Sequence, residues 1–233
     1  MTPIPFLIRR SKQRETVALT IENDGRLVVT APGGVSIDLL NRVVRRKAPW
    51  VVQRIRRVRT LPPPPSDREF VSGETVLYLG RHLRLKVIET EEEERTRIWA
   101  GRYEVGVRTG LKGKDRRTEV RRQLVGSLKE HADLYMPDRL DQVCEQLRIE
   151  KPSIVVREQK KRWGSCDAKG VLRINWRIIQ APIPLIEYVL VHELTHLQHP
   201  NHDRHFWAAL GRVMPDYEEL RSRLRELGPR LEW

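Results

Sequence analysis

The stretch VHELTHLQHPNHDRHFW, Val191–Trp207, decides how this chain can fold and act, because it holds five of the seven histidines in 233 residues. Its first part, His192-Glu193-Leu194-Thr195-His196, has the pattern HExxH. Two histidines four residues apart on a helix project from one face, so both imidazoles can reach one Zn²⁺ ion. Glu193 lies beside the first histidine and can act as general base toward a water molecule that the metal activates.

A catalytic zinc ion usually has three protein ligands, and His202 is the preferred third ligand here. It lies six residues after His196, which is the spacing of HExxHxxGxxH zinc sites. His199 occupies the usual glycine position, so the turn must be built differently, for instance with Asn201 at a positive φ. His199 and His205 compete for the same role. His199 is close to the helix end, however, and His205 points into the next helix.

The residues around HExxH matter because the pattern alone also occurs by chance. Val189, Leu190, Leu194 and Leu197 give the helix an apolar side, which predicts a buried helix. A buried helix that presents two histidines is costly unless the imidazoles have a partner. The alternative is a surface helix rich in histidine, and three ligands in register with a glutamate argue against it.

A basic run upstream of the histidines ends in an aromatic residue, a glycine and two small polar residues. Gly164 would allow close approach of the backbone to a ligand or to a neighbouring helix. The cations before it could meet an anionic substrate. An equally good interpretation is a solvated edge segment with a tryptophan in the core. The candidates for substrate contact are Lys161, Arg162, Trp163, Gly164, Ser165 and Cys166.

The composition restricts the class of protein. The net charge is +13 and the pI about 10.2, which attracts polyanions such as nucleic acid without giving specificity. Two cysteines without a CxxC pair fit a reducing compartment. We see no convincing signal peptide and no stretch near the roughly 20 apolar residues that span a bilayer, which predicts a cytoplasmic protein without a membrane partner. The oligomeric state stays open.

Periodicity predicts an α+β protein. Residues 1–60 would form a ββα unit, with a hairpin around Asn23-Asp24-Gly25 and a helix from about Ile37 to Val58, in which Pro49 can start a second segment. Four prolines at 62–65 favour a stiff connector. The outward helix face is basic; its cations are Arg42, Arg45, Arg46, Lys47, Arg54 and Arg57.

Residues 61–115 would form a β-rich segment with four strands, and residues 116–233 a helical catalytic core. The core begins with a helix over 116–147 that we expect to be interrupted near Pro137. The HExxH helix would run from Leu185 to about His199 and stop at Pro200. We expect the three segments to make one compact structural domain.

Taken together, RWGSC, INWRII and HELTHLQHPNHDRHFW, with LIRRSKQRETVALTI and WVVQRI nearer the start, resemble the YgjP-like zinc metallopeptidase family over nearly the whole chain. Asp203 stands where serine is more usual after the third histidine. The resemblance implies a zincin-like α+β catalytic domain that includes the N-terminal ββα unit. It also implies Zn²⁺ held by His192, His196 and His202, with Glu193 as base.

Three functions follow. The leading hypothesis is a zinc-dependent metallopeptidase with a peptide substrate. The second keeps the metal site for a nucleoside triphosphate (UTP) pyrophosphatase, an activity that the resemblance also implies. A metal-activated water can attack a carbonyl or a phosphoryl centre, and the net charge of +13 and the run Lys160-Lys161-Arg162 favour a nucleotide. The third is a basic nucleic-acid-binding protein with a structural metal. A structural zinc site does not need Glu193, and three histidines leave one position open, which argues against the third hypothesis.

Overall fold

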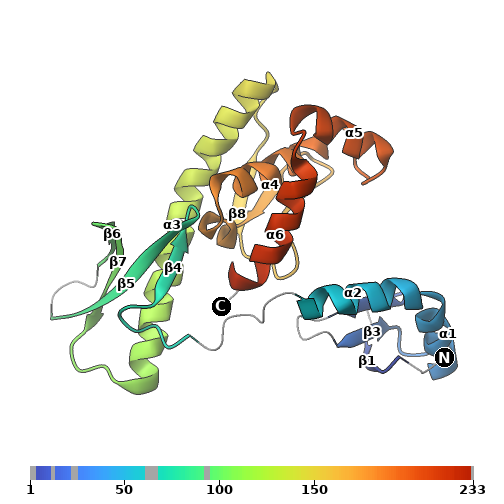
Figure 1. Ribbon diagram of the computed structural model, residues 1–233, viewed down its shortest axis with the longest axis horizontal. Helices are drawn as coiled ribbons and strands as arrows, with labels where there is room; N and C mark the ends of the chain where they lie inside the picture. Colours follow the sequence, from blue (N-terminus) through green and yellow to red (C-terminus); the bar gives the residue numbers. More distant parts are fainter. Residues whose placement is uncertain (1–3, 12–13, 22–25, 61–67, 92–94, 232–233) are drawn as a thin grey trace. The chain divides into compact units, whose positions relative to one another are not determined.

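The computed structural model of the protein describes residues 4–11, 14–21, 26–60, 68–91 and 95–231. Contacts divide the chain into two units, Met1–Ser66 and Asp67–Trp233. The predicted turn at 23–25 and the proline connector at 62–65 lie outside the described residues. The division into three segments of one compact domain stays a prediction. The α+β class is confirmed by helices and three small sheets, which Figure 1 shows.

The N-terminal unit contains a three-stranded sheet in the order β1-β3-β2. Strands β2 (Ala18–Ile21) and β3 (Leu27–Ala31) pair antiparallel, as the hairpin prediction requires. Strand β1 (Phe6–Arg10) pairs parallel with β3 and was missed, because four of its five residues are exposed and it lacks an alternating pattern. The unit is therefore larger than the predicted ββα.

Two helices follow the N-terminal sheet, and the second begins beside Pro49, as the sequence predicted. Ser36 caps α1 (Ile37–Arg46) by accepting a hydrogen bond from the backbone N–H of Leu39. The second helix, α2 (Ala48–Thr60), has Pro49 in its first turn, where a missing N–H costs nothing. Apolar residues of the sheet and both helices make a small core: Leu27, Val29, Ala31, Leu40, Val44 and Val51.

The second unit is organised along one long helix, α3 (Gly113–Leu147). A four-stranded sheet in the order β4-β5-β7-β6 packs on its N-terminal half, and β8 and α4 lie along the other half (Figure 1). The strands are β4 (Thr75–Tyr78), β5 (Arg81–Thr90), β6 (Thr96–Trp99) and β7 (Arg102–Arg108).

The predicted interruption of α3 at Pro137 is wrong, because the helix continues through this residue. Residues at intervals of four, from Val120 through Ala132 and Met136 to Leu140, stay fully buried across the proline. The carbonyl that loses its hydrogen bond belongs to the exposed Asp133, so water can satisfy it. Packing on both sides therefore outweighs the local cost of proline.

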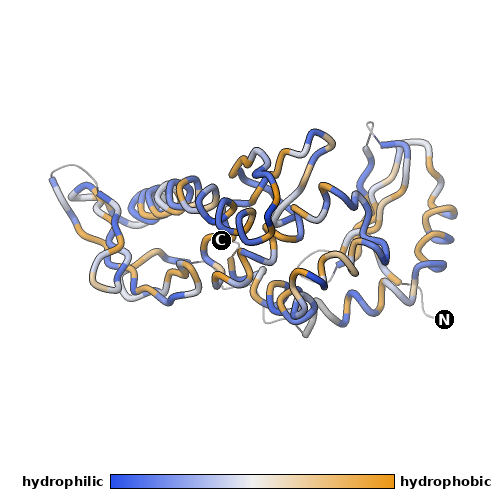
Figure 2. Tube along the Cα trace, turned by 90° about the horizontal axis from the view of Figure 1, so that it is seen from above, coloured by the Kyte–Doolittle hydropathy of each residue, from blue (hydrophilic) through white to orange (hydrophobic). Residues whose placement is uncertain are grey.

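A second sheet of this unit has the order β8-β10-β9. Strand β8 (Ile154–Arg157) pairs parallel with β10 (Leu172–Asn175), and β9 (Gly164–Cys166) pairs antiparallel with β10. A short 3₁₀ helix, η1 (Trp176–Gln180), leads into the C-terminal helices. These are α4 (Ile183–Thr195), α5 (Arg204–Val213) and α6 (Tyr217–Leu231). Hydrophilic and hydrophobic residues alternate along the helices in Figure 2, as expected for amphipathic helices that bury one face.

Candidate metal centre

Helix α4 carries the first two histidines into the interior. It begins after Pro182, and most of its side chains are buried, as the apolar pattern predicted. It ends at Thr195, four residues before the predicted end at His199. Backbone bonds tighten the chain at this point, from His196 to Glu193 (3.2 Å) and from Leu197 to Leu194 (3.0 Å). The turn therefore begins before Pro200 instead of at it.

The structure brings His192, His196 and His202 together. One ring nitrogen of each lies within 4.8 Å of the others, and the Nε2 atoms of His192 and His202 are 2.9 Å apart. The Nδ1 atom of His196 lies 3.0 Å from the carbonyl oxygen of His199, which fixes the proton on Nδ1 and leaves Nε2 as a lone-pair donor. His199 thus contributes its carbonyl group to the site.

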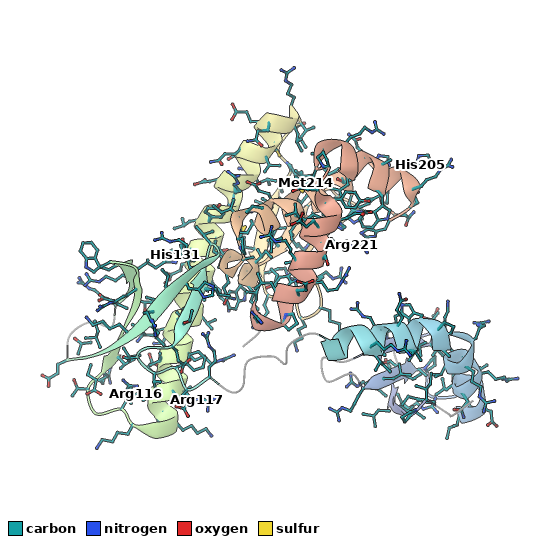
Figure 3. The ribbon with its side chains drawn as sticks, viewed as in Figure 1. Arg116, Arg117, His131, His205, Met214 and Arg221 are labelled. Atoms are coloured by element: carbon teal, nitrogen blue, oxygen red, sulfur yellow. The ribbon has the colours of Figure 1, made fainter. Side chains whose placement is uncertain are left out.

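His205 lies away from these three rings. It is exposed on α5, where its Nε2 accepts a hydrogen bond from the neighbouring Arg204. Figure 3 shows its side chain at the outer end of the helix.

The three imidazoles fit a divalent metal ion. Burial, and after it the proximity of His202, His196 and Arg221, lowers the pKa of His192 to about 3, so its imidazole is neutral, the form that binds metals. Burial also lowers the pKa of His202. The ligand nitrogens of all three histidines lie close enough together to share one metal ion, and those of His192 and His202 are the nearest pair.

An aromatic platform supports the three rings. Phe206 is fully buried, and its ring centroid lies 4.9 Å from that of His192 and 4.6 Å from those of His196 and His202. The indole N–H of Trp207 donates to the backbone carbonyl of His202 (3.1 Å). The start of α5 therefore holds the third histidine in place from two sides.

The position of Asp203 at the start of α5 explains why an aspartate can stand after the third histidine in place of serine. Its carboxylate caps α5 by accepting hydrogen bonds from the backbone N–H groups of His205 (2.8 Å) and Phe206 (3.0 Å). Serine and aspartate are both good N-cap residues, so either can begin this helix.

Glu193 packs between α4 and β9. It is 5% exposed, and its carboxylate accepts a hydrogen bond from the backbone N–H of Cys166. Burial raises its pKa to about 7, while the charge of Arg162 and the Cys166 N–H oppose that rise. A Cβ atom on Gly164 would lie 2.6 Å from both Cγ and Oε1 of Glu193. The close approach predicted for Gly164 is therefore to this glutamate.

The segment before β9 is fixed by a buried asparagine. The side-chain amide of Asn175 donates to the carbonyl oxygens of Gln159 (2.8 Å) and Arg162 (3.2 Å). Its backbone N–H donates to the carbonyl oxygen of Trp163 (2.8 Å). This clip sets the position of β9 relative to α4.

The six candidates for substrate contact divide in the structure. Lys161 and Arg162 are exposed. Trp163 is half-buried and packs against Gly228 of α6, which favours a structural role for it. Ser165 bonds to the side chain of Gln159 (3.4 Å). Their roles toward a substrate stay predictions.

Arg221 is a neighbour of the site that sequence reasoning missed. It lies on α6 with its guanidinium carbon 4.6 Å from the centre of the Trp207 ring, and Figure 3 labels it there. Trp207 stacks on Tyr217 with a ring separation of 5.5 Å. The Arg221 charge contributes to lowering the pKa of His192 and His202. Among the described residues, it has no carboxylate partner.

No helix in the described part of the chain has the length and apolarity to span a bilayer.

Comparisons with known proteins bear on identity. Over residues 15–227 the sequence matches the family described as YgjP-like, metallopeptidase domain. Two archaeal metallopeptidase zymogens are similar among solved structures. Abylysin of Pyrococcus abyssi has 22% sequence identity and a TM-score of 0.37, and the match covers 41% of this chain and 97% of the abylysin chain. Jannalysin of Methanocaldococcus jannaschii has 21% sequence identity and a TM-score of 0.35, and the match covers 39% of this chain and 94% of the jannalysin chain. No curated protein matches the sequence.

The family match includes the histidine triad, Glu193 and β9, and it extends over most of both units. It confirms the resemblance drawn from the sequence motifs. The chain therefore belongs to the YgjP-like metallopeptidase family and is a metal-dependent hydrolase.

Proposed function

We propose that the protein is a zinc-dependent peptidase in which His192, His196 and His202 hold the metal and Glu193 is the general base. The observation that carries the proposal is the position of the Glu193 carboxylate. It is buried beside the first histidine and held by a backbone N–H of β9. A purely structural metal would leave this buried acid without a role.

The residues divide the work as follows. Zinc, when bound, supplies a Lewis acid that polarises the scissile group and makes water acidic near neutral pH. Glu193, buried beside the first histidine, would accept the proton of the attacking water and pass it to the leaving amine. The Cys166 N–H and the absence of a side chain at Gly164 keep the carboxylate oriented for this purpose.

The substrate would bind along β9. This strand is the outer strand of its sheet and pairs only with β10 among the described residues. An extended peptide can add to such an edge through backbone hydrogen bonds, next to Glu193. Arg221 on α6 would then face the substrate. Its guanidinium would meet either the negative charge that develops during the reaction or a carboxylate group of the substrate.

A nucleoside triphosphate is the second candidate substrate. Lys160, Lys161 and Arg162 are exposed immediately before β9, where the phosphates of a nucleotide would find three cations. The same metal and the same base would serve phosphoryl hydrolysis.

The metal assignment is tested by zinc content. We would dialyse the protein against zinc-free buffer and measure bound zinc by plasma mass spectrometry. The His202→Ala variant should lose most of its zinc, whereas His205→Ala, a matched exposed histidine on the same segment, should keep it. Equal zinc retention by both variants would refute the assignment of the third ligand.

The role of Glu193 and the substrate class are tested together. The zinc-loaded protein and its Glu193→Gln variant would be given fluorescein-labelled casein and, separately, UTP. Loss of casein hydrolysis in a variant that keeps its zinc supports the proposed peptidase. Pyrophosphate release from UTP that depends on Glu193, without casein hydrolysis, would replace the peptide by a nucleotide.

A further inference from the structure

The positive charge of the protein is concentrated in its N-terminal unit. Residues 1–66 contain 13 Lys and Arg against 4 Asp and Glu, a net charge of +9. The other 167 residues contribute only +4 of the total of +13. The hydrolase site lies entirely in the second unit, so the function proposed above gives this charge no role.

The helices of this unit turn their cations outward. Leu40 and Val44 are buried in the small core, and Arg42, Arg45 and Arg46 lie on the opposite face of α1, three and four residues apart. Exposed cations continue across the break into α2. The six exposed cations of the two helices, called the arginine face below, are Arg42, Arg45, Arg46, Lys47, Arg54 and Arg56. The side chain of Arg57, which the sequence placed on this face, lies outside the described residues.

These six cations have no carboxylate partner among the described residues. Asp38 is the single acidic residue in the sequence of α1 and α2. The second unit is different, since its arginines pair with carboxylates in examples such as Arg97 with Glu104 and Arg177 with Glu158. An uncompensated group of arginines repels itself, and a polyanion would relieve that repulsion.

We propose that the arginine face binds the phosphate backbone of single-stranded nucleic acid. Arginine is the favoured cation here, and its planar guanidinium matches phosphate oxygens with two parallel hydrogen bonds. Trp50 is 44% exposed and lies four residues before Arg54, so both can face the same ligand. An exposed indole beside cations offers a surface on which unpaired bases stack. The charge, the residue type and the aromatic ring agree on one ligand.

An anionic membrane fits the same helices less well. A helix that lies in a membrane interface buries an apolar face in the acyl region. The apolar face of α1 is already occupied by the core of its own unit, through Leu40 and Val44. The large apolar residues exposed on the described part of the two helices are Ile37 and Leu39 in the first turn of α1 and Trp50 and Val52 of α2, and these four do not form a continuous apolar face. Binding would therefore rest on charge without insertion.

The salt dependence of binding gives a quantitative test. Six cations on single-stranded nucleic acid give a slope of log K against log[salt] of about −4, since each contact contributes about −0.7. We would measure the anisotropy of a fluorescein-labelled thymidine 20-mer titrated with the full chain at several NaCl concentrations. The variant Arg42→Ala/Arg45→Ala/Arg46→Ala should bind more weakly, with a slope smaller by about 2.

A matched variant separates this face from the general charge of the protein. Arg81→Ala/Arg102→Ala/Arg108→Ala removes the same number of exposed arginines from β5 and β7 of the second unit. It should keep the affinity and the slope of the unaltered protein. Thermal melting followed by circular dichroism would establish that both triple variants are folded. Equal weakening in the two variants, or no weakening in the first, would overturn the proposal.

Two further measurements test the kind of ligand. Trp50→Ala should weaken binding to the thymidine 20-mer and leave binding to a 20-base-pair duplex nearly unchanged, because paired bases cannot stack on the indole. Equal loss on both would refute the single-strand assignment. Sedimentation with phosphatidylglycerol vesicles provides the competing outcome. Strong vesicle binding without oligonucleotide binding would replace nucleic acid by a membrane surface.

Discussion

Gly164 offers a sharp test of how the site is built, because its missing side chain leaves the space that Glu193 occupies. A Cβ atom at this position would lie 2.6 Å from Cγ and Oε1 of Glu193 and 2.9 Å from its Cδ. Carbon atoms in contact are ordinarily about 3.5–4.0 Å apart, so the overlap is roughly 1 Å. The backbone of Gly164 is not among the positive-φ positions. Alanine can therefore adopt its conformation, and the clash alone should decide the outcome.

The expected loss follows from this displacement. The side chain of Glu193 must move by roughly 1 Å, and misplacement of that size costs catalysis on the order of 10²-fold. Overpacking at a buried position also costs about 1–3 kcal/mol of stability. The three atoms nearest to the added carbon all belong to Glu193, so the histidines should keep their positions and their zinc.

The assay compares Gly164→Ala with Gly126→Ala. Gly126 lies on α3 with no heavy atom within 4 Å of an added Cβ, so alanine there should preserve activity and stabilise the helix by about 0.5–1 kcal/mol. We would measure bound zinc, the denaturation midpoint and the rate of casein hydrolysis for both variants. A Gly164→Ala protein with full zinc and an undiminished rate would refute the idea that Gly164 positions Glu193.

Three further predictions concern stability. In metal-free protein, the pKa of Glu193 rises from 4.5 to about 7 on folding, so its stabilising contribution is present below pH 4.5 and lost as the pH rises through 7. We would measure the free energy of unfolding by urea, in the presence of a chelator, for the unaltered protein and for Glu193→Gln. As the pH rises from below 4.5 to above 7, the stability of the variant relative to the unaltered protein should increase by roughly 3 kcal/mol. Asp203→Ala should lose about 1 kcal/mol and weaken zinc binding, while Asp203→Ser should keep both, as zinc titration and thermal melting can measure. Pro137→Ala should raise the melting temperature by restoring a helix hydrogen bond to Asp133, worth up to about 3 kcal/mol, and a lower temperature would contradict that account.

Local elements of the fold were predictable, and long-range pairing was less so. The hairpin of β2 and β3 and the helices around Pro49 follow from turn residues and periodicity within a few residues. The parallel pairing of β1 with β3 joins segments about 20 residues apart, and the exposed side chains of β1 give no alternating pattern. Pro137 misled the prediction because the buried stripe of α3, spread over several turns, outweighs one local breaker.

The same distinction holds within the site. His192 and His196 follow from helical spacing, and His202 follows from the spacing rule for the third ligand. Arg221 could not be inferred, because its place depends on how α6 packs beside α5 and Trp207. Phe206 reads in the sequence as an ordinary core residue of an amphipathic helix. Only its contact with three imidazoles reveals that it supports the histidines.

The motifs that identify the family are specific because residues from distant segments of the chain contact one another at a single site. Gly164 of RWGSC provides space for Glu193 of HELTH, and the next strand supplies Asn175 to hold the loop before β9. Asp203 then caps the helix whose Phe206 lies under the three imidazoles. Each segment alone is common, since glycines, capping residues and HExxH all occur by chance. Their combination is rare because each residue meets a steric or hydrogen-bonding requirement set by another. A sequence that keeps HExxH but replaces Gly164 by a larger residue should therefore lose the base while retaining the metal.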